Sequence, residues 1–189
     1  QPGATENTTD PASNAALLIE LNGNNTIGTG FTITASNCVV RGLVMNRFTT
    51  NSINLSSTAS NTVLTGCYFG TNAAGTAASG TGNGVVIASG NNQIGGWSVN
   101  ERCHFSGATT NAGLRFTGAL ATGNYVRVCH FGLSADGTTA IGGLQQGIRF
   151  EAGANWNQIG ETGCCINRIT GASGAGIAML GVTSDNNNV

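Results

Sequence analysis

Lysine is absent from the sequence, proline occurs only twice, and charged residues make up 8% of the chain. Without a lysine amine, the chain can neither form a Schiff base nor bind phosphate as a P-loop does. The net charge of -1 provides no positive surface for a polyanion, so we expect no nucleic-acid partner. No apolar run approaches the roughly 20 residues of a spanning helix, so we expect no membrane span.

A short unit recurs six times instead: a small residue, an apolar residue, any residue and a second apolar residue. The first apolar positions are 22, 32, 29, 34 and 29 residues apart. Such alternation is typical of strands, and units of this length must stack to bury their apolar faces. The pattern therefore predicts a solenoid with twelve inward positions, which pair as Phe31 and Ile33, Ile53 and Leu55, Val85 and Ile87, Leu114 and Phe116, Ile148 and Phe150, and Ile177 and Met179.

A second unit interleaves with the first and ends on two columns of residues that lie two positions apart. Because alternate residues of a strand share a face, we expect both columns to point inward. One column reads Leu43, Cys67, Cys103 and Cys129, and the other reads Met45, Phe69, Phe105, Phe131 and Ile169.

Two segments carry a family resemblance: Cys67–Ala78 and Asn91–Gly96. They resemble the repeats of bacterial secreted and surface parallel β-helix proteins. The resemblance implies an all-β, right-handed parallel β-helix and an extracellular or cell-surface location, but no single activity. Members of that family commonly have Asn where this sequence has the three cysteines of the inward column, and only Asn167 keeps it. We therefore expect a Cys column to replace the internal Asn ladder.

The chain is expected to form one domain, residues 1–189, with about six coils that alternate between short and long. The start, Gln1–Ala4, resembles the interior of a coil, and Asn186–Val189 resembles the opening of another unit. Solenoid ends of this kind expose strand edges and core. We expect a section of a longer solenoid or a subunit that stacks on copies of itself, with flanking coils or further copies as partners.

The cysteines invite a disulfide framework, but their placement favours free thiols. Buried Cys behaves as a small hydrophobe, and three of the six lie in the inward column. A coil spacing of about 4.8 Å also permits disulfides within that column, so this alternative stays open. Cys164 and Cys165 lie in a loop-like stretch and are the expected place for a reactive or bridged thiol.

His104 and His130 each follow a cysteine of the inward column and are the weak candidates for a metal site. Strand alternation turns each imidazole outward while its cysteine points inward, so one ligand set cannot include both. No third ligand stands at zinc-site spacing. We expect an outward surface column in which Tyr68 precedes the two histidines and Arg168 follows them.

The outward face of the first unit brings Arg115, Arg149 and Glu151 together, the weak candidates for a catalytic site. Glycoside hydrolysis needs two carboxyl groups roughly 5 to 10 Å apart, and this face offers one. A calcium-assisted lyase would need several carboxylates. The simpler interpretation is an ion pair that relieves two stacked arginines.

These features predict a non-catalytic structural or adhesive β-solenoid segment of an exported protein, without a cofactor, that assembles end to end into fibres and has weak affinity for glycans. The alternative is a polysaccharide lyase or glycoside hydrolase that acts on the outward face of the first unit. A third hypothesis is a partner-binding platform formed by the long loops Thr71–Asn83 and Leu133–Gln146, which the repeat places on one side.

Overall fold

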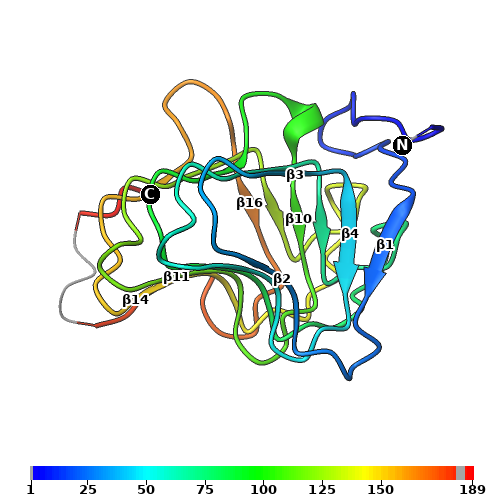
Figure 1. Cartoon of the computed structure of the whole chain (residues 1–189). Helices are drawn as coiled ribbons and strands as arrows, with labels where there is room; N and C mark the ends of the chain where they lie inside the picture. Colours follow the sequence, from blue (N-terminus) through cyan, green and yellow to red (C-terminus); the bar gives the residue numbers. More distant parts are fainter. Residues whose placement is uncertain (1, 182–185) are drawn as a thin grey trace.

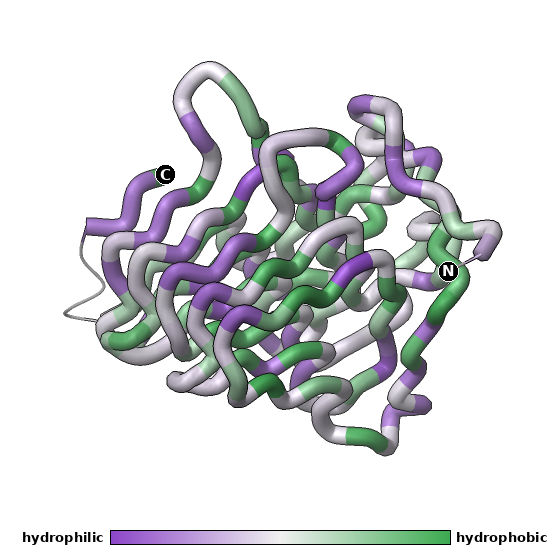
Figure 2. The backbone as a smooth tube through the Cα atoms, turned by 45° about the horizontal axis from the view of Figure 1, so that its top comes forward, coloured by the Kyte–Doolittle hydropathy of each residue, from purple (hydrophilic) through white to green (hydrophobic). Residues whose placement is uncertain are grey.

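The structure, a computed structural model, describes residues 2–181 and 186–189, so Gln1 of the expected open end lies outside it. These residues form three parallel sheets and one short 3-10 helix, η1 (Val99–Glu101). Each turn of the chain passes through the three sheets in the same order, and Figure 2 shows these turns stacked side by side. The expected parallel β-helix is confirmed.

The first sheet consists of six strands that follow one another from coil to coil, and its members are β2 (Thr29–Ile33), β5 (Asn51–Leu55), β8 (Asn83–Ile87), β11 (Ala112–Thr117), β14 (Gln146–Glu151) and β17 (Ile177–Met179). The second sheet has five: β3 (Val39–Arg41), β6 (Val63–Thr65), β9 (Gln93–Gly95), β12 (Tyr125–Arg127) and β15 (Gln158–Ile159). The third has six, several of them labelled in Figure 1: β1 (Ile19–Asn22), β4 (Leu43–Asn46), β7 (Tyr68–Phe69), β10 (His104–Phe105), β13 (His130–Phe131) and β16 (Arg168–Ile169).

The apolar ladder of the first sheet has the expected register. Phe31 pairs with Ile53, and the pairing continues through β8, β11 and β14 to Ile177. The central members are fully buried, whereas Met179, in the last strand of the sheet, is 48% exposed. The strict alternation of the sequence thus decides which face of the sheet closes the core.

The third sheet contributes the aromatic stack of the core. Phe69, Phe105 and Phe131 pair in register, and their ring centroids lie 4.9 and 4.8 Å apart. This distance is the ordinary spacing of parallel strands, so identical residues on successive coils stack without any shift of the backbone. Gly132, directly after Phe131, has φ +74°, and a Cβ there would lie 1.9 Å from the carbonyl oxygen of Thr170. Gly70, directly after Phe69, has the same constraint, so the bends after Phe69 and Phe131 require glycine, whereas Ser106 follows Phe105.

The expected Cys column is present, and an internal Asn ladder that the sequence analysis did not predict lies at another corner. The main-chain N–H of Asn92 donates to Asn124 Oδ1 at 2.8 Å, and that of Asn124 donates to Asn157 Oδ1 at 3.1 Å. Asn157 continues the series to Asn187. The ladder lies at the start of the second sheet, one corner away from the Cys column. The cysteines therefore do not replace it, because the two columns occupy different corners of the coil.

The N-terminal strap (residues 2–17) packs on the outer face of the third sheet. It is closed by main-chain hydrogen bonds between Thr5 and Ala16, and Ser13 Oγ lies 2.8 Å from Tyr68 Oη. Asp10 pairs with Arg102, whose side chain is only 2% exposed. Figure 1 shows this segment in dark blue beside β1. The strap gives the outer face of the third sheet a second, polar layer.

The two long loops lie together on one side of the solenoid, as expected. Each is closed by an antiparallel bridge, Thr71 to Ala78 in one and Leu133 to Ala140 in the other. The N–H of Ala135 donates to the carbonyl of Gly75 at 2.8 Å and joins the loops. Within the described ranges, no helix is long and apolar enough to cross a membrane.

Candidate functional site

The predicted cluster on the first sheet exists. Arg115 and Arg149 pair in register, and both reach Glu151. Arg115 Nε donates to Glu151 Oε1 at 2.6 Å, and Arg149 Nε donates to Oε2 at 2.6 Å. Partial burial works to raise the pKa of Glu151, but the two guanidinium groups outweigh it and lower that pKa. Both oxygens of the carboxylate are occupied, so Glu151 is ionised and badly suited to donate a proton.

No second carboxylate accompanies Glu151 in the described strands of this sheet. It is the only Asp or Glu in the six strands of the first sheet. Glycoside hydrolysis requires a pair of carboxyl groups. The cluster therefore has the chemistry of a surface ion pair, as the simpler interpretation predicts.

The histidine column has the expected register but not the expected exposure. His104 pairs with Tyr68 and with His130, which pairs with Arg168, and the His104 and His130 ring centroids are 5.0 Å apart. Both imidazoles point away from the cysteines, yet both are fully buried. The prediction of a surface column is wrong, because loop residues and the strap, whose Ser13 bonds Tyr68, cover the outer face of the third sheet.

The two histidines do not form a metal site in the described part of the chain, where no third His, Cys, Asp or Glu joins them. No ring nitrogen of either one has a hydrogen-bond partner. Burial lowers the pKa of His104, with His130 and Arg102 adding to the effect. Burial, Arg102 and Arg168 lower the pKa of His130 to about 3, although Asp10 opposes this. Both rings are neutral at pH 7.

The thiol predictions are confirmed. Cys67, Cys103 and Cys129 are free and fully buried, and Cys103 Sγ lies 3.4 Å from the carbonyl oxygen of Leu64 and interacts with the thiols of Cys67 and Cys129. Burial raises the pKa of the Cys103 thiol far above its usual range. Cys164 and Cys165 are bridged to each other. The three buried cysteines therefore serve as apolar core residues, whereas Cys164 and Cys165 form the disulfide.

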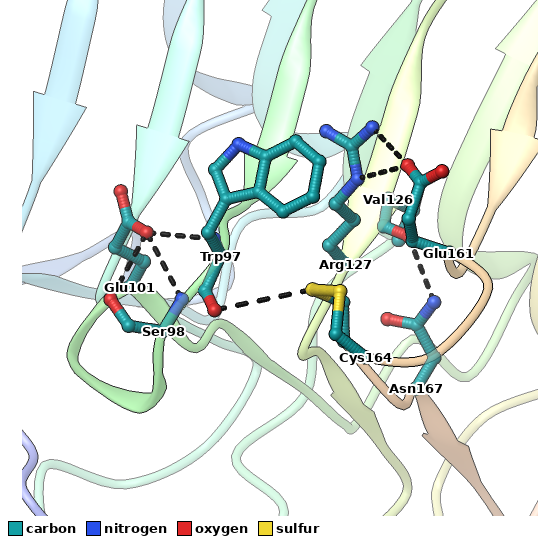
Figure 3. The surroundings of a disulfide bond; sticks show 9 residues. Trp97, Ser98, Glu101, Val126, Arg127, Glu161, Cys164 and Asn167 are labelled. Atoms are coloured by element: carbon teal, nitrogen blue, oxygen red, sulfur yellow. Dashed lines mark hydrogen bonds and ion pairs between the residues drawn. A yellow bond between two sulfur atoms is a disulfide. The ribbon is translucent and has the colours of Figure 1, made fainter.

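An exposed aromatic site, which the sequence analysis did not predict, lies on the second sheet. The guanidinium carbon of Arg127 lies 4.0 Å from the ring centroid of Trp97 and 4.3 Å from that of Tyr125. Figure 3 shows the indole beside this guanidinium, which on its other side reaches Glu161. Arg127 Nη2 donates to Glu161 Oε2 at 2.6 Å, and Arg127 lowers the pKa of that carboxyl group.

Local structure fixes Trp97 at this position. The main-chain N–H of Trp97 donates to Glu101 Oε2 at 2.8 Å. Ser98 and Glu101 form the capping box of η1. The Arg127 side chain is 6% exposed, whereas Trp97 is 58% exposed. The ring is thus packed on one side and open to solvent on the other.

A second tryptophan lies on the adjacent coil. Trp156 is 64% exposed and stands two residues before Gln158, the strand partner of Tyr125. Tyr125 itself is 39% exposed. We call these three residues the aromatic face (Trp97, Tyr125 and Trp156). The one available signal was the spacing of Tyr125 and Arg127, which alternation places on the same side of β12.

The three sheets and their stacked ladders define the chain as a parallel β-helix. Comparisons with protein-family models, with curated proteins and with solved structures find no match to it.

Proposed function

We propose that this chain is a non-catalytic, adhesive β-solenoid segment of an exported protein, and that it adheres to neutral saccharides through the aromatic face. The observation that carries the proposal is the exposure of Trp97, a ring held rigidly over Arg127 with one side open to solvent. Tryptophan and tyrosine are enriched at the interfaces of folded proteins, because one side chain combines a large apolar surface with a polar group.

The chemistry of the face favours sugar rings. An aromatic ring offers a flat apolar surface, which matches the C–H face of a pyranose, and a rigid aromatic side chain loses little entropy on binding. The positive charge of Arg127 is compensated by Glu161, so the cation beside the Trp97 ring is already paired and offers an acidic saccharide no free partner.

Export is supported by the disulfide between Cys164 and Cys165, since disulfides persist in oxidising compartments. The non-catalytic part of the proposal is supported by Glu151, whose two carboxylate oxygens are both held by arginine. The rival lyase or hydrolase would need that carboxylate free.

Affinity electrophoresis in gels that contain neutral or acidic polysaccharides tests the proposal. We expect a neutral polysaccharide to retard the protein, with Trp97→Ala and Trp156→Ala each weakening retention at least threefold. Leu120→Ala is the matched control, since Leu120 is 61% exposed but lies outside the face. Equal retention of all variants, or retention by acidic gels alone, would overturn the assignment of the site.

Enzyme activity is tested separately by measuring new reducing ends and unsaturated products after incubation with the same polysaccharides. We expect none. Turnover that Glu151→Gln abolishes would establish the rival enzyme.

We also propose that coils continue the solenoid beyond β16 and β17 and build fibres. The last described strand of the first sheet leaves core positions open: Met179 pairs with the fully buried Phe150 but is 48% exposed, and Ile177 pairs with the fully buried Ile148 but is only partly buried. A further coil, from flanking sequence or from another copy, would cover them. Light scattering and electron microscopy of the native material should show filaments or axial multimers, and a dispersed 19.0 kDa monomer without flanking coils contradicts this.

A further inference from the structure

The loop between β15 and β16 carries the disulfide that joins Cys164 to Cys165 (Figure 3). The four other cysteines are free. Cys164 is exposed, whereas Cys165 is 8% exposed and its Sγ lies 4.0 Å from the carbonyl oxygen of Trp97. The bond therefore has one sulfur facing solvent and one facing the protein.

Adjacency in the sequence makes this bond more reducible than most. Neighbouring Cα atoms are held 3.8 Å apart by the peptide unit, closer than the 4.4 to 6.8 Å of ordinary disulfides. Disulfides outside the usual range are more easily reduced, and exposed ones are the labile or regulatory ones. Location in a loop rather than in the ladders lets the bond open without breaking a sheet.

Two arginines share a hollow with the inner sulfur. Cys165 lines a hollow of about 180 Å³ together with Arg102, Arg168 and Asp10. Two guanidinium groups and one carboxylate give this hollow a net positive charge. A thiolate is stabilised beside arginine, and a more stable thiolate leaves a disulfide faster. Cys165 is thus the better leaving group of the pair.

The other side of the disulfide has room for an attacking molecule. A second hollow, of about 310 Å³, is lined by both cysteines and by polar groups that include Gln158, Glu161 and Asn188. This volume suits a small molecule of about tripeptide size rather than a folded domain. The charge of Glu161 is already balanced by Arg127.

We propose that Cys164 is a covalent acceptor site for low-molecular-weight thiols. The thiolate of the small molecule attacks Cys164 Sγ and forms a new S–S bond, while the bond to Cys165 breaks and its electron pair leaves as the Cys165 thiolate. One disulfide replaces another, so the step needs no further oxidant. The reverse attack by the Cys165 thiolate releases the small thiol and restores the original bond.

The test uses the native, air-oxidised protein and reduced glutathione as the probe. After exchange, free thiols are blocked with N-ethylmaleimide, and the site of each adduct is read by peptide mass spectrometry. We expect glutathione on Cys164 and the blocking group on Cys165. Glutathione on Cys165, or an intact disulfide in the native protein with exchange only after denaturation, would overturn the proposal.

The role of the cations is tested by Arg168→Gln, with Arg115→Gln on the first sheet as the matched control. We expect the first variant to slow exchange about three- to tenfold and the second to leave it unchanged. Equal rates in both contradict the leaving-group assignment. A folded protein with one exposed cysteine is the second arm, and exchange faster than with glutathione would overturn the choice of a small thiol.

Discussion

Acidification should loosen the N-terminal strap through His104 and His130. Both imidazoles are fully buried beneath the outer layer of the third sheet, and none of their nitrogens has a hydrogen-bond partner. The charged groups nearest to them are Arg102, Arg168 and Asp10. A proton on either ring would therefore create a buried cation beside two others, with one carboxylate to offset them.

The magnitude follows from His130. Its pKa falls from 6.5 in the unfolded chain to about 3 in the fold, because burial and the two arginines oppose the charged form. The folded state thus favours the neutral ring, and the stability that it contributes is complete above pH 6.5 and lost as the pH falls toward 3. At pH 4.5 the loss is about 3 kcal/mol. If the strap detaches, the imidazoles reach solvent and can take up protons without further cost. The stability lost on acidification therefore cannot exceed the free energy with which the strap binds the third sheet.

Hydrogen exchange of the strap amides, Ser13 and Ala16 above all, measures this release between pH 6.5 and 4.5. Both amides bond to main-chain carbonyls in the docked strap. In wild type, protection should fall steadily over this interval, after correction for intrinsic exchange rates. In the double variant His104→Leu, His130→Leu, which cannot take up these protons, protection should stay level.

The result that refutes this reasoning is an equal loss of protection in wild type and in the double variant. The pH dependence would then come from contacts of the strap other than the two imidazoles, since the double variant cannot take up their protons. A variant that is already unprotected at pH 7 would show instead that the strap docks on the imidazoles themselves.

Three further changes test the core. Gly132→Ala should lower the free energy of unfolding by about 3 kcal/mol or more in urea titrations, because the new Cβ would overlap a carbonyl oxygen. The control is Gly163→Ala, at a position with φ +80° and open space around it, and it should lower that free energy by only about 1 kcal/mol. Asn124→Ala should cost about 3 kcal/mol in the same titrations, since it leaves the N–H of Asn92 buried without its acceptor, and a cost below about 1 kcal/mol would show the ladder to be dispensable. A thiol reagent should label Cys38 in the native protein, whereas labelling before denaturation is not expected at the three buried thiols, Cys67, Cys103 and Cys129.

Local alternation was sufficient to predict the inner surface of the solenoid. Ile53, Val85 and Leu114 occupy the same position in successive units and pair with one another. Stacking at the strand spacing buries them, and this burial does not depend on the loops. The same argument predicted the Cys column and the meeting of Arg115 with Glu151, since both depend only on alternation and register. The Asn ladder was not predicted, because the family resemblance placed its Asn residues at the corner that the Cys column occupies.

The tertiary structure alone decided what covers the outer faces. Alternation correctly predicted that His104 points away from the core. The layer that covers the outer face, however, consists of the strap, whose Ser13 bonds Tyr68, and of the loop that contains Leu133, and no periodicity relates these segments to the third sheet. The packing of Trp97 on Arg127 likewise joins a loop side chain to a strand of another coil. Repetition along the chain fixes the contacts that every coil shares, because each coil meets the same neighbours. Contacts made by single segments recur nowhere in the sequence, so only the folded chain brings them together.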